Sequence, residues 1–272
     1  MTLPHSYLMA LMLTILTMIC WGSWANVLKL AKGWRFELLY YDYSIGVALG
    51  AALAGMTFGT WGSDGLRFLD DLSHAGAVNI LSGFAGGVVF NLSNILVVGA
   101  ISVAGMGVGF PIGVGLALVV GVIWNYVVNP QGNPLLLFAG VALVVGAIVV
   151  DAIAYRAHAV SRSTAGDKAD AAAKRAATWK GIRLSVVGGM AWIAGSLSNF
   201  VAASAPRELQ VGPAISYAIG QGSTMVGALW GVLVWREFAG GGARVNRLLV
   251  LMFVLFVAGL GLVSIAPLFA GR

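Results

Sequence analysis

Charged residues are scarce in this chain of 272 amino acids, where Asp, Glu, Lys and Arg together make up 10%. Soluble domains carry about 25% charged residues, so the scarcity excludes an ordinary soluble protein, a disordered chain and a nucleic-acid binder with a charged face. A single cysteine, Cys20, excludes a disulfide framework and a cysteine-based metal site. The chain contains instead 59% hydrophobic residues and 38 glycines, a composition typical of polytopic membrane proteins.

Eight apolar runs are long enough to cross a bilayer, which takes about 20 residues for each helix. The runs are continuous and do not alternate apolar with polar residues, which excludes membrane-spanning strands. The predicted fold class is therefore an all-α polytopic membrane protein with eight transmembrane helices. The predicted spans are 6–30, 36–58, 78–100, 106–129, 134–155, 181–204, 211–235 and 247–267.

The basic residues predict the orientation of these spans. With the N-terminus outside, 13 of the 16 Lys and Arg residues face the cytoplasm. The positive-inside rule therefore predicts an inner-membrane protein with both termini outside. The longest polar stretch, 156–179, is then a cytoplasmic linker. It joins a first repeat of five helices, 1–155, to a second, shortened repeat of three helices, 180–272.

A weak internal repeat relates spans three to five to spans six to eight. Residues 92–94 (LSN) recur as 197–199, and residues 120–124 (VGVIW) recur as 226–230 (VGALW). On the predicted topology the two copies run through the membrane in opposite directions. Inverted repeats are typical of secondary transporters, whose substrate sites lie near the midplane where the repeats meet.

Several stretches resemble a known group of proteins. Residues 20–26 (CWGSWAN) are similar to the opening helix of the drug/metabolite transporter superfamily. Residues 40–45 (YYDYSI), 211–217 (VGPAISY) and 235–237 (WRE) resemble the ureide permeases and their bacterial relatives. The resemblance implies a ten-helix fold of two five-helix inverted repeats, of which this chain is a shortened form. The second repeat lacks counterparts of spans one and two, which leaves a homodimer open as the complete transport unit.

Polar and aromatic side chains inside the spans are the candidate site, because polar groups are costly to place in a bilayer. Amides hydrogen-bond polar ligands, and indole rings stack on flat heterocycles or sugar faces. The alternative role for these side chains is packing between helices. The predicted substrate-binding residues are Trp21, Trp24, Asn26, Asn91, Asn94, Trp192, Asn199, Tyr217 and Gln221.

Two acidic residues inside spans are considered separately. Asp42 lies about six residues, or ~9 Å, from the cytoplasmic end of span two. A protonatable carboxyl at that depth predicts a role in proton coupling; the alternative is an interfacial Asp held by tyrosine hydroxyls or by Lys32. Asp151 is expected to pair with Arg156 near the membrane surface.

The remaining sequence patterns argue against two classes of function. The three histidines lie at span ends or in loops, and no phosphate-binding loop precedes a suitable lysine, which argues against an intramembrane enzyme and an ATP-driven pump. No cofactor, metal or nucleic acid is therefore expected. The predicted function is secondary transport of a small, neutral polar solute, which the resemblance implies is ureide-like or nucleobase-like. A sugar permease of the same superfamily is the runner-up, and a non-transporting membrane scaffold subunit is the alternative from another class. The predicted partners are the solute and the lipid bilayer.

Overall fold

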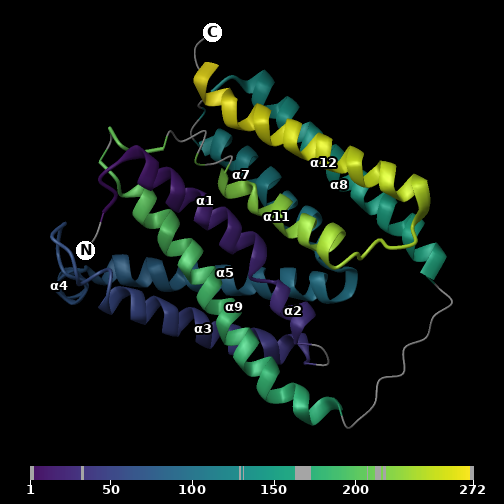
Figure 1. The fold of residues 1–272 in the computed structure, drawn as a ribbon. Coiled ribbons are helices and arrows are strands. Elements are labelled where there is room, and N and C mark those ends of the chain that lie inside the picture. Colours follow the sequence, from purple (N-terminus) through teal and green to yellow (C-terminus); the bar gives the residue numbers. More distant parts are fainter. Residues whose placement is uncertain are drawn as a thin grey trace. The chain divides into compact units, whose positions relative to one another are not determined.

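A computed structural model of the chain describes residues 3–31, 34–128, 130, 132–162, 173–206, 208–211, 216 and 219–269. The regular structure of these residues is helical, which confirms the predicted fold class (Figure 1). Seven of the described helices are long and apolar enough to cross a membrane, and they coincide with seven predicted spans. The span predicted at 211–235 corresponds to a shorter apolar helix, Ile219–Val234, and residues 212–215, 217 and 218 lie outside the described part. The chain is thus a multi-pass membrane protein.

Contacts between the helices divide the chain into two units. Unit 1 comprises Met1–Ser102 with Ala171–Val211, and unit 2 comprises Val103–Asp170 with Gly212–Arg272. Each unit therefore combines helices from both halves of the sequence. The predicted linker 156–179 is partly helical, because one helix extends to Arg162 and the next begins at Ala173.

Unit 1 is organised around a long helix, α9, on which α1 and α3 pack (Figure 1). Glycines permit these contacts, since a Cβ at Gly189 would meet the carbonyl oxygen of Tyr43 and a Cβ at Gly46 would meet the backbone of Val186. The helices of unit 1 are α1 (Tyr7–Ser23), α2 (Asn26–Leu30), α3 (Phe36–Met56), α4 (Phe68–His74), α5 (Ala77–Ala104) and α9 (Ala173–Ala203).

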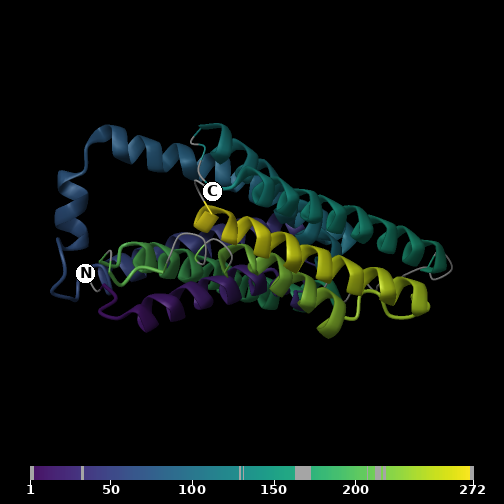
Figure 2. The same cartoon turned by 90° about the horizontal axis from the view of Figure 1, so that it is seen from above.

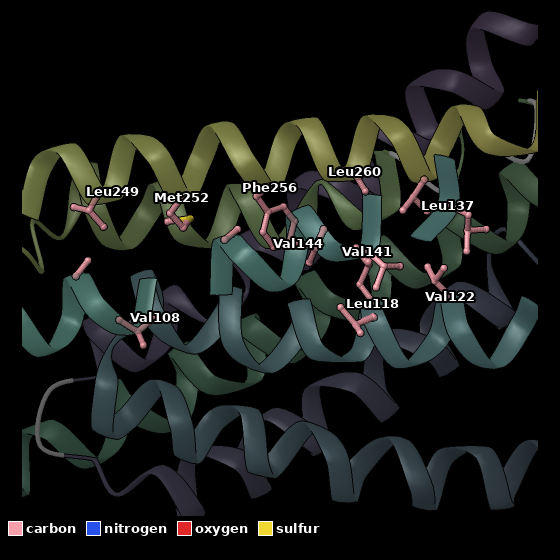
Figure 3. Close-up of a cluster of buried hydrophobic side chains, with 14 of the residues drawn as sticks. Val108, Leu118, Val122, Leu137, Val141, Val144, Leu249, Met252, Phe256 and Leu260 are labelled. Atoms are coloured by element: carbon pink, nitrogen blue, oxygen red, sulfur yellow. The ribbon is translucent and has the colours of Figure 1, made fainter. Parts of the chain in front are cut away.

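Unit 2 is held together by α8 and α12, which lie side by side in both views (Figures 1 and 2). Its core is aliphatic apart from a few rings, and in Figure 3 Phe256 and Met252 of α12 lie opposite Val144 of α8. The elements of unit 2 are α6 (Met106–Gly109), η1 (Phe110–Val114), α7 (Gly115–Val128), α8 (Pro134–Arg162), α11 (Ser223–Leu229), η2 (Trp230–Val234), α12 (Gly242–Ile265) and η3 (Ala266–Phe269).

Two glycines set the closest approach of α8 to α12. A Cβ built on Gly140 would lie 2.6 Å from the carbonyl oxygen of Gly259, and a Cβ on Gly259 would lie 2.7 Å from the carbonyl oxygen of Gly140. The contact is therefore reciprocal between the two backbones. Small residues at such a crossing let membrane helices pack by van der Waals contact, since lipid supplies no hydrophobic force between them.

The span Met106–Val128 begins with an irregular turn. The π-helical turn η1 includes Pro111, which has no N–H to donate to the helix. At the start of the span, the carboxylate of Glu237 accepts the backbone N–H groups of Met106 and Gly107 at 2.8 and 2.7 Å. Gly105 precedes them with a φ of 88°, a conformation that L side chains rarely adopt. The loop after η2 thus caps the first turn of this span.

Candidate functional site

Two tyrosines of α3 bind two asparagines of α5 inside unit 1. The hydroxyl of Tyr40 donates to Asn91, whose side-chain Oδ1 and main-chain oxygen lie 2.8 and 3.1 Å away. The Asn94 Nδ2 donates to the Tyr43 hydroxyl at 3.3 Å. The two tyrosines are three residues apart in the sequence, and so are the two asparagines. This spacing places the tyrosines on one face of α3 and the asparagines on one face of α5. Tyr43 is completely buried and Tyr40 almost so.

Unit 1 also contains aromatic rings from four helices that pack against one another. The Tyr43 ring packs against Tyr40 at a centroid distance of 5.4 Å and against Trp24, which directly follows α1, at 4.7 Å. Trp192 of α9 stacks on Phe90 of α5 at 4.4 Å and is nearly parallel to Trp21, with a centroid distance of 6.4 Å. Such offset stacks are the arrangements that aromatic quadrupoles favour.

A serine of α9 orients one of these indoles. The Trp21 Nε1 donates to the Ser196 Oγ at 3.0 Å, and the same hydroxyl donates to the main-chain oxygen of Trp192 at 3.2 Å. One turn earlier in α1, the Thr17 hydroxyl is within 2.9 Å of the main-chain oxygen of Gly195. Ser196 is 3% exposed, so its two hydrogen bonds replace the water that it loses on burial.

We name these nine side chains the aromatic–amide cluster. They offer flat π-faces together with hydroxyl and carboxamide groups that both donate and accept hydrogen bonds. None of the nine carries a formal charge, so the cluster is chemically suited to a neutral, flat, amide-bearing molecule. The cluster consists of two groups of side chains, each in mutual contact: Trp24, Tyr40, Tyr43, Asn91 and Asn94 in the first, and Trp21, Phe90, Trp192 and Ser196 in the second.

Five of the nine predicted substrate-binding residues lie in this cluster: Trp21, Trp24, Asn91, Asn94 and Trp192.

The other four predicted residues lie elsewhere or outside the described part. The Asn26 Nδ2 donates to the main-chain oxygen of Ser23 at 2.8 Å, at the junction of α1 and α2. Asn199 is half-buried, seven residues beyond Trp192 on α9. Gln221 is half-buried in unit 2. Tyr217 lies outside the described residues.

The two acidic residues differ sharply in their surroundings. The half-buried Asp42 accepts a hydrogen bond from the Trp34 Nε1 at 3.1 Å. The expected pairing of Asp151 with Arg156 is wrong, because Asp151 is completely buried without a hydrogen bond and Arg156 is exposed. Residues five apart are separated by about 140° around an α-helix, so the two side chains cannot share a face.

Sequence reasoning missed Tyr40, Tyr43, Phe90 and Ser196 as members of the site. The signal for the tyrosines was present, since both lie in the stretch 40–45 that resembles the ureide permeases. The polar Asp42 between them was preferred as the functional group. No comparable signal marks Phe90 or Ser196, because an apolar ring and a serine are common on any face of a membrane helix. Among the described residues, no group of three or more His, Cys, Asp or Glu could hold a metal ion.

A family model described as "Ureide permease" matches residues 39–178, which is just over half of the chain. The chain belongs to the ureide permease family. The match covers the tyrosine and asparagine pairs of the aromatic–amide cluster, whereas Trp21, Trp24 and Trp192 lie outside it.

Two relatives from Arabidopsis thaliana match this ureide permease family member. "Ureide permease 2" is 30% identical over 151 residues, which are 53% of this chain and 38% of the relative. "Ureide permease 1" is 26% identical over 153 residues, 55% of this chain and 39% of the relative. The matched part is therefore under two fifths of the length of either relative. No solved structure matches the chain.

Proposed function

We propose that the chain is a secondary transporter of a small, neutral polar solute of ureide-like or nucleobase-like chemistry, and not an enzyme. The observation that carries the proposal is the aromatic–amide cluster of unit 1. Its hydroxyls and carboxamides bind one another across α3 and α5 at 2.8 to 3.3 Å. The names of the two relatives point to the same class of solute.

The way in which a solute binds follows from these contacts. Cyclic ureides and nucleobases carry N–H and C=O groups in one plane. Such a molecule replaces the Tyr40–Asn91 and Tyr43–Asn94 hydrogen bonds with its own, so no polar group is left without a partner. Its faces are covered by Trp192 and Trp24. Asn26, Asn199, Tyr217 and Gln221 remain predicted contacts of the solute.

Alternating access by inverted repeats is part of the proposal. The repeats are 1–155 and 180–272, joined by 156–179, and a homodimer is the arrangement that would supply the missing helices. Two observations support a pairing of repeat copies. The third and sixth spans, α5 and α9, both contribute to unit 1, and the fifth and eighth, α8 and α12, pack together in unit 2. The reciprocal contact of Gly140 with Gly259 also fits such a pairing.

Orientation and coupling complete the proposal. Both termini lie outside the inner membrane, as the basic residues predict. Asp42 is proposed to exchange protons with the cytoplasmic side, since its half-buried carboxylate has Trp34 as a donor and retains access to water. An Asp42→Asn variant should then lose accumulation driven by a pH gradient and keep exchange of solute.

The test is counterflow in vesicles that contain only this protein. Vesicles loaded with unlabelled allantoin, uracil or glucose are diluted into the labelled form of the same compound. The proposal expects transient uptake of label with allantoin or uracil. Uptake with glucose alone would favour a sugar permease, and no uptake with any of the three would favour a scaffold subunit. A thermal-shift measurement with the same compounds reports binding independently of transport.

A further inference from the structure

Unit 2 encloses a carboxyl group that lacks a polar partner among the described residues. The Asp151 side chain on α8 is 0% exposed, and neither carboxyl oxygen has a hydrogen-bond partner there. Ala147 and Ala154, one turn to either side, belong to the aliphatic core shared with α12. Asp151 lies seven residues, or ~10 Å, before His158, the last residue of the helical segment that is apolar enough to cross a membrane. The group is thus shielded from water inside unit 2.

A charged group of the same sign as an ionised Asp151 acts on it. The carboxylate of Glu237 repels a negative charge on Asp151. Glu237 itself accepts the backbone N–H groups of Met106 and Gly107, at the start of a span whose N-terminus carries a partial positive charge. Glu237 thus has hydrogen-bond donors, whereas Asp151 has none among the described residues.

The described arginine side chains of unit 2 are turned to the surface rather than to Asp151. Those on α8, on α12 and in the loop after η2 are all exposed, namely Arg156, Arg244, Arg247 and Arg236. His158 is buried two turns farther along α8, where its ring packs against Phe238 at 5.5 Å. The other described titratable side chains on α8 and on the helices packed against it are Tyr126 and Tyr155.

An ionised carboxylate at Asp151 would raise the free energy of this conformation. A charge buried without a partner costs several kcal/mol even after the protein relaxes. Two neighbouring carboxyl groups avoid this cost when one of them carries a proton, and the group without donors is the one that takes it. We propose that Asp151 is a proton-binding site, which holds its proton in the conformation described here and releases it during the transport cycle.

This inference rests on the proposed transport function and adds a second, enclosed carboxyl to Asp42. When Asp151 releases its proton, its negative charge is repelled by the carboxylate of Glu237. The repulsion opposes the packing in which Glu237 caps Met106 and Gly107. The conformation with the capped span therefore binds a proton more tightly than one in which Asp151 reaches water, and this difference couples the proton to the conformational change.

Infrared spectroscopy of the purified protein tests proton binding without any transport. The parent protein should show the C=O stretch of a protonated carboxyl at neutral pH. Asp151→Asn should remove that band, and the matched Asp42→Asn variant should keep it. Glu237→Gln should keep the band at neutral pH. As the pH is raised, the band should disappear at a lower pH than in the parent, because the charge that repels an ionised Asp151 is gone. A parent spectrum without the band, or an identical spectrum for Asp151→Asn, would overturn the proposal.

A second measurement in vesicles tests coupling. Labelled allantoin should accumulate in parent vesicles under a pH gradient, and Asp151→Asn should abolish accumulation but keep counterflow, because the amide mimics the protonated acid. Accumulation equal to the parent, or accumulation driven by sodium without any effect of pH, overturns the role of Asp151 in coupling. If the parent transports no probe, the proposed function fails, and the infrared band still decides whether Asp151 binds a proton.

Discussion

In unit 1 the hydroxyl and amide groups of the aromatic–amide cluster have partners, whereas two buried groups of unit 2, Asp151 and Thr224, have none among the described residues. Tyr43 and Asn94 bind each other, and Ser196 binds Trp21. Groups that satisfy one another can exchange their contacts for those of a solute at little net cost. A buried polar group without a hydrogen-bond partner instead raises the free energy of the folded state through lost solvation or electrostatic repulsion. This difference is the basis for the two proposed tasks, solute recognition in unit 1 and proton binding in unit 2.

The way in which the helices meet differs as well. Unit 1 places rings from α1, α3, α5 and α9 in stacked contact, with the Phe90–Trp192 pair as the closest at 4.4 Å. Unit 2 packs α8 on α12 through aliphatic side chains and the contact of Gly140 with Gly259 (Figure 3). Stacked rings can part and admit a flat molecule between them, but two backbones in contact leave no such space.

The helix crossings are where a substitution should destabilise most. Gly140→Leu in unit 2 and Gly189→Leu in unit 1 each push a side chain against the backbone of the facing helix. Each should lower the free energy of unfolding by at least about 2–3 kcal/mol, as overpacking does. Thermal unfolding in detergent, followed by size-exclusion chromatography, measures the loss.

Matched controls exist in both units. Gly261→Leu in unit 2 and Gly83→Leu in unit 1 place the same side chain where nothing lies within 4 Å. These two variants should be as stable as the parent or more so by up to ~1 kcal/mol, since Leu favours helix over Gly. Equal losses for all four variants would mean that the crossings do not hold the units together.

Removal of a hydroxyl from the aromatic–amide cluster should weaken solute binding. Tyr40→Phe removes the donor that binds both oxygens of Asn91. The affinity for the transported ureide or nucleobase should fall about tenfold, which corresponds to ~1.4 kcal/mol. Tyr41→Phe is the matched control, because Tyr41 is 71% exposed. Titration of solute in a thermal-shift assay gives both affinities; an equal loss in the two variants would remove Tyr40 from the site.

The smallest effects should have opposite signs in the two units. Ser196→Ala leaves the half-buried Trp21 Nε1 without its acceptor and should cost about 1 kcal/mol of stability. Thr224→Val replaces a buried hydroxyl that has no hydrogen-bond partner by a methyl group of similar size. It should be neutral or stabilise by up to ~1 kcal/mol. Thermal unfolding of both variants checks the signs, and a destabilised Thr224→Val would contradict the contrast between the units.

The spans could be predicted from the sequence because continuous apolar runs of about 20 residues have few alternatives in a membrane protein. The side chains of the site were harder to predict. Apolar residues occur on every face of α3 and of α5. The period of the hydrophobic pattern therefore does not tell which face of either helix is turned inward. The three-residue spacing of Asn91 and Asn94 is that of neighbours on one helical face, whereas the partners of these residues, Tyr40 and Tyr43, depend on how α3 packs.

The error at Asp151 has a different cause. Charge pairing was inferred from proximity in the sequence, but helical geometry separates residues five apart. The face on which Asp151 lies is decided by the packing of α8 on α12, since Ala147 and Ala154 above and below it are both buried there. The sequence alone contains no signal for the influence of Glu237, which lies 86 residues away along the chain.

Direct binding of a labelled ureide or nucleobase to purified protein tests the central claim, that the aromatic–amide cluster receives the solute. The measurement compares the parent with Trp192→Ala, which removes the stacks on Phe90 and Trp21, and with Phe84→Ala, which alters a 70% exposed ring on α5. The account predicts that Trp192→Ala weakens binding about tenfold or more, since each lost stack is worth ~1 kcal/mol, and that Phe84→Ala binds as the parent does. Unchanged binding by Trp192→Ala would contradict it.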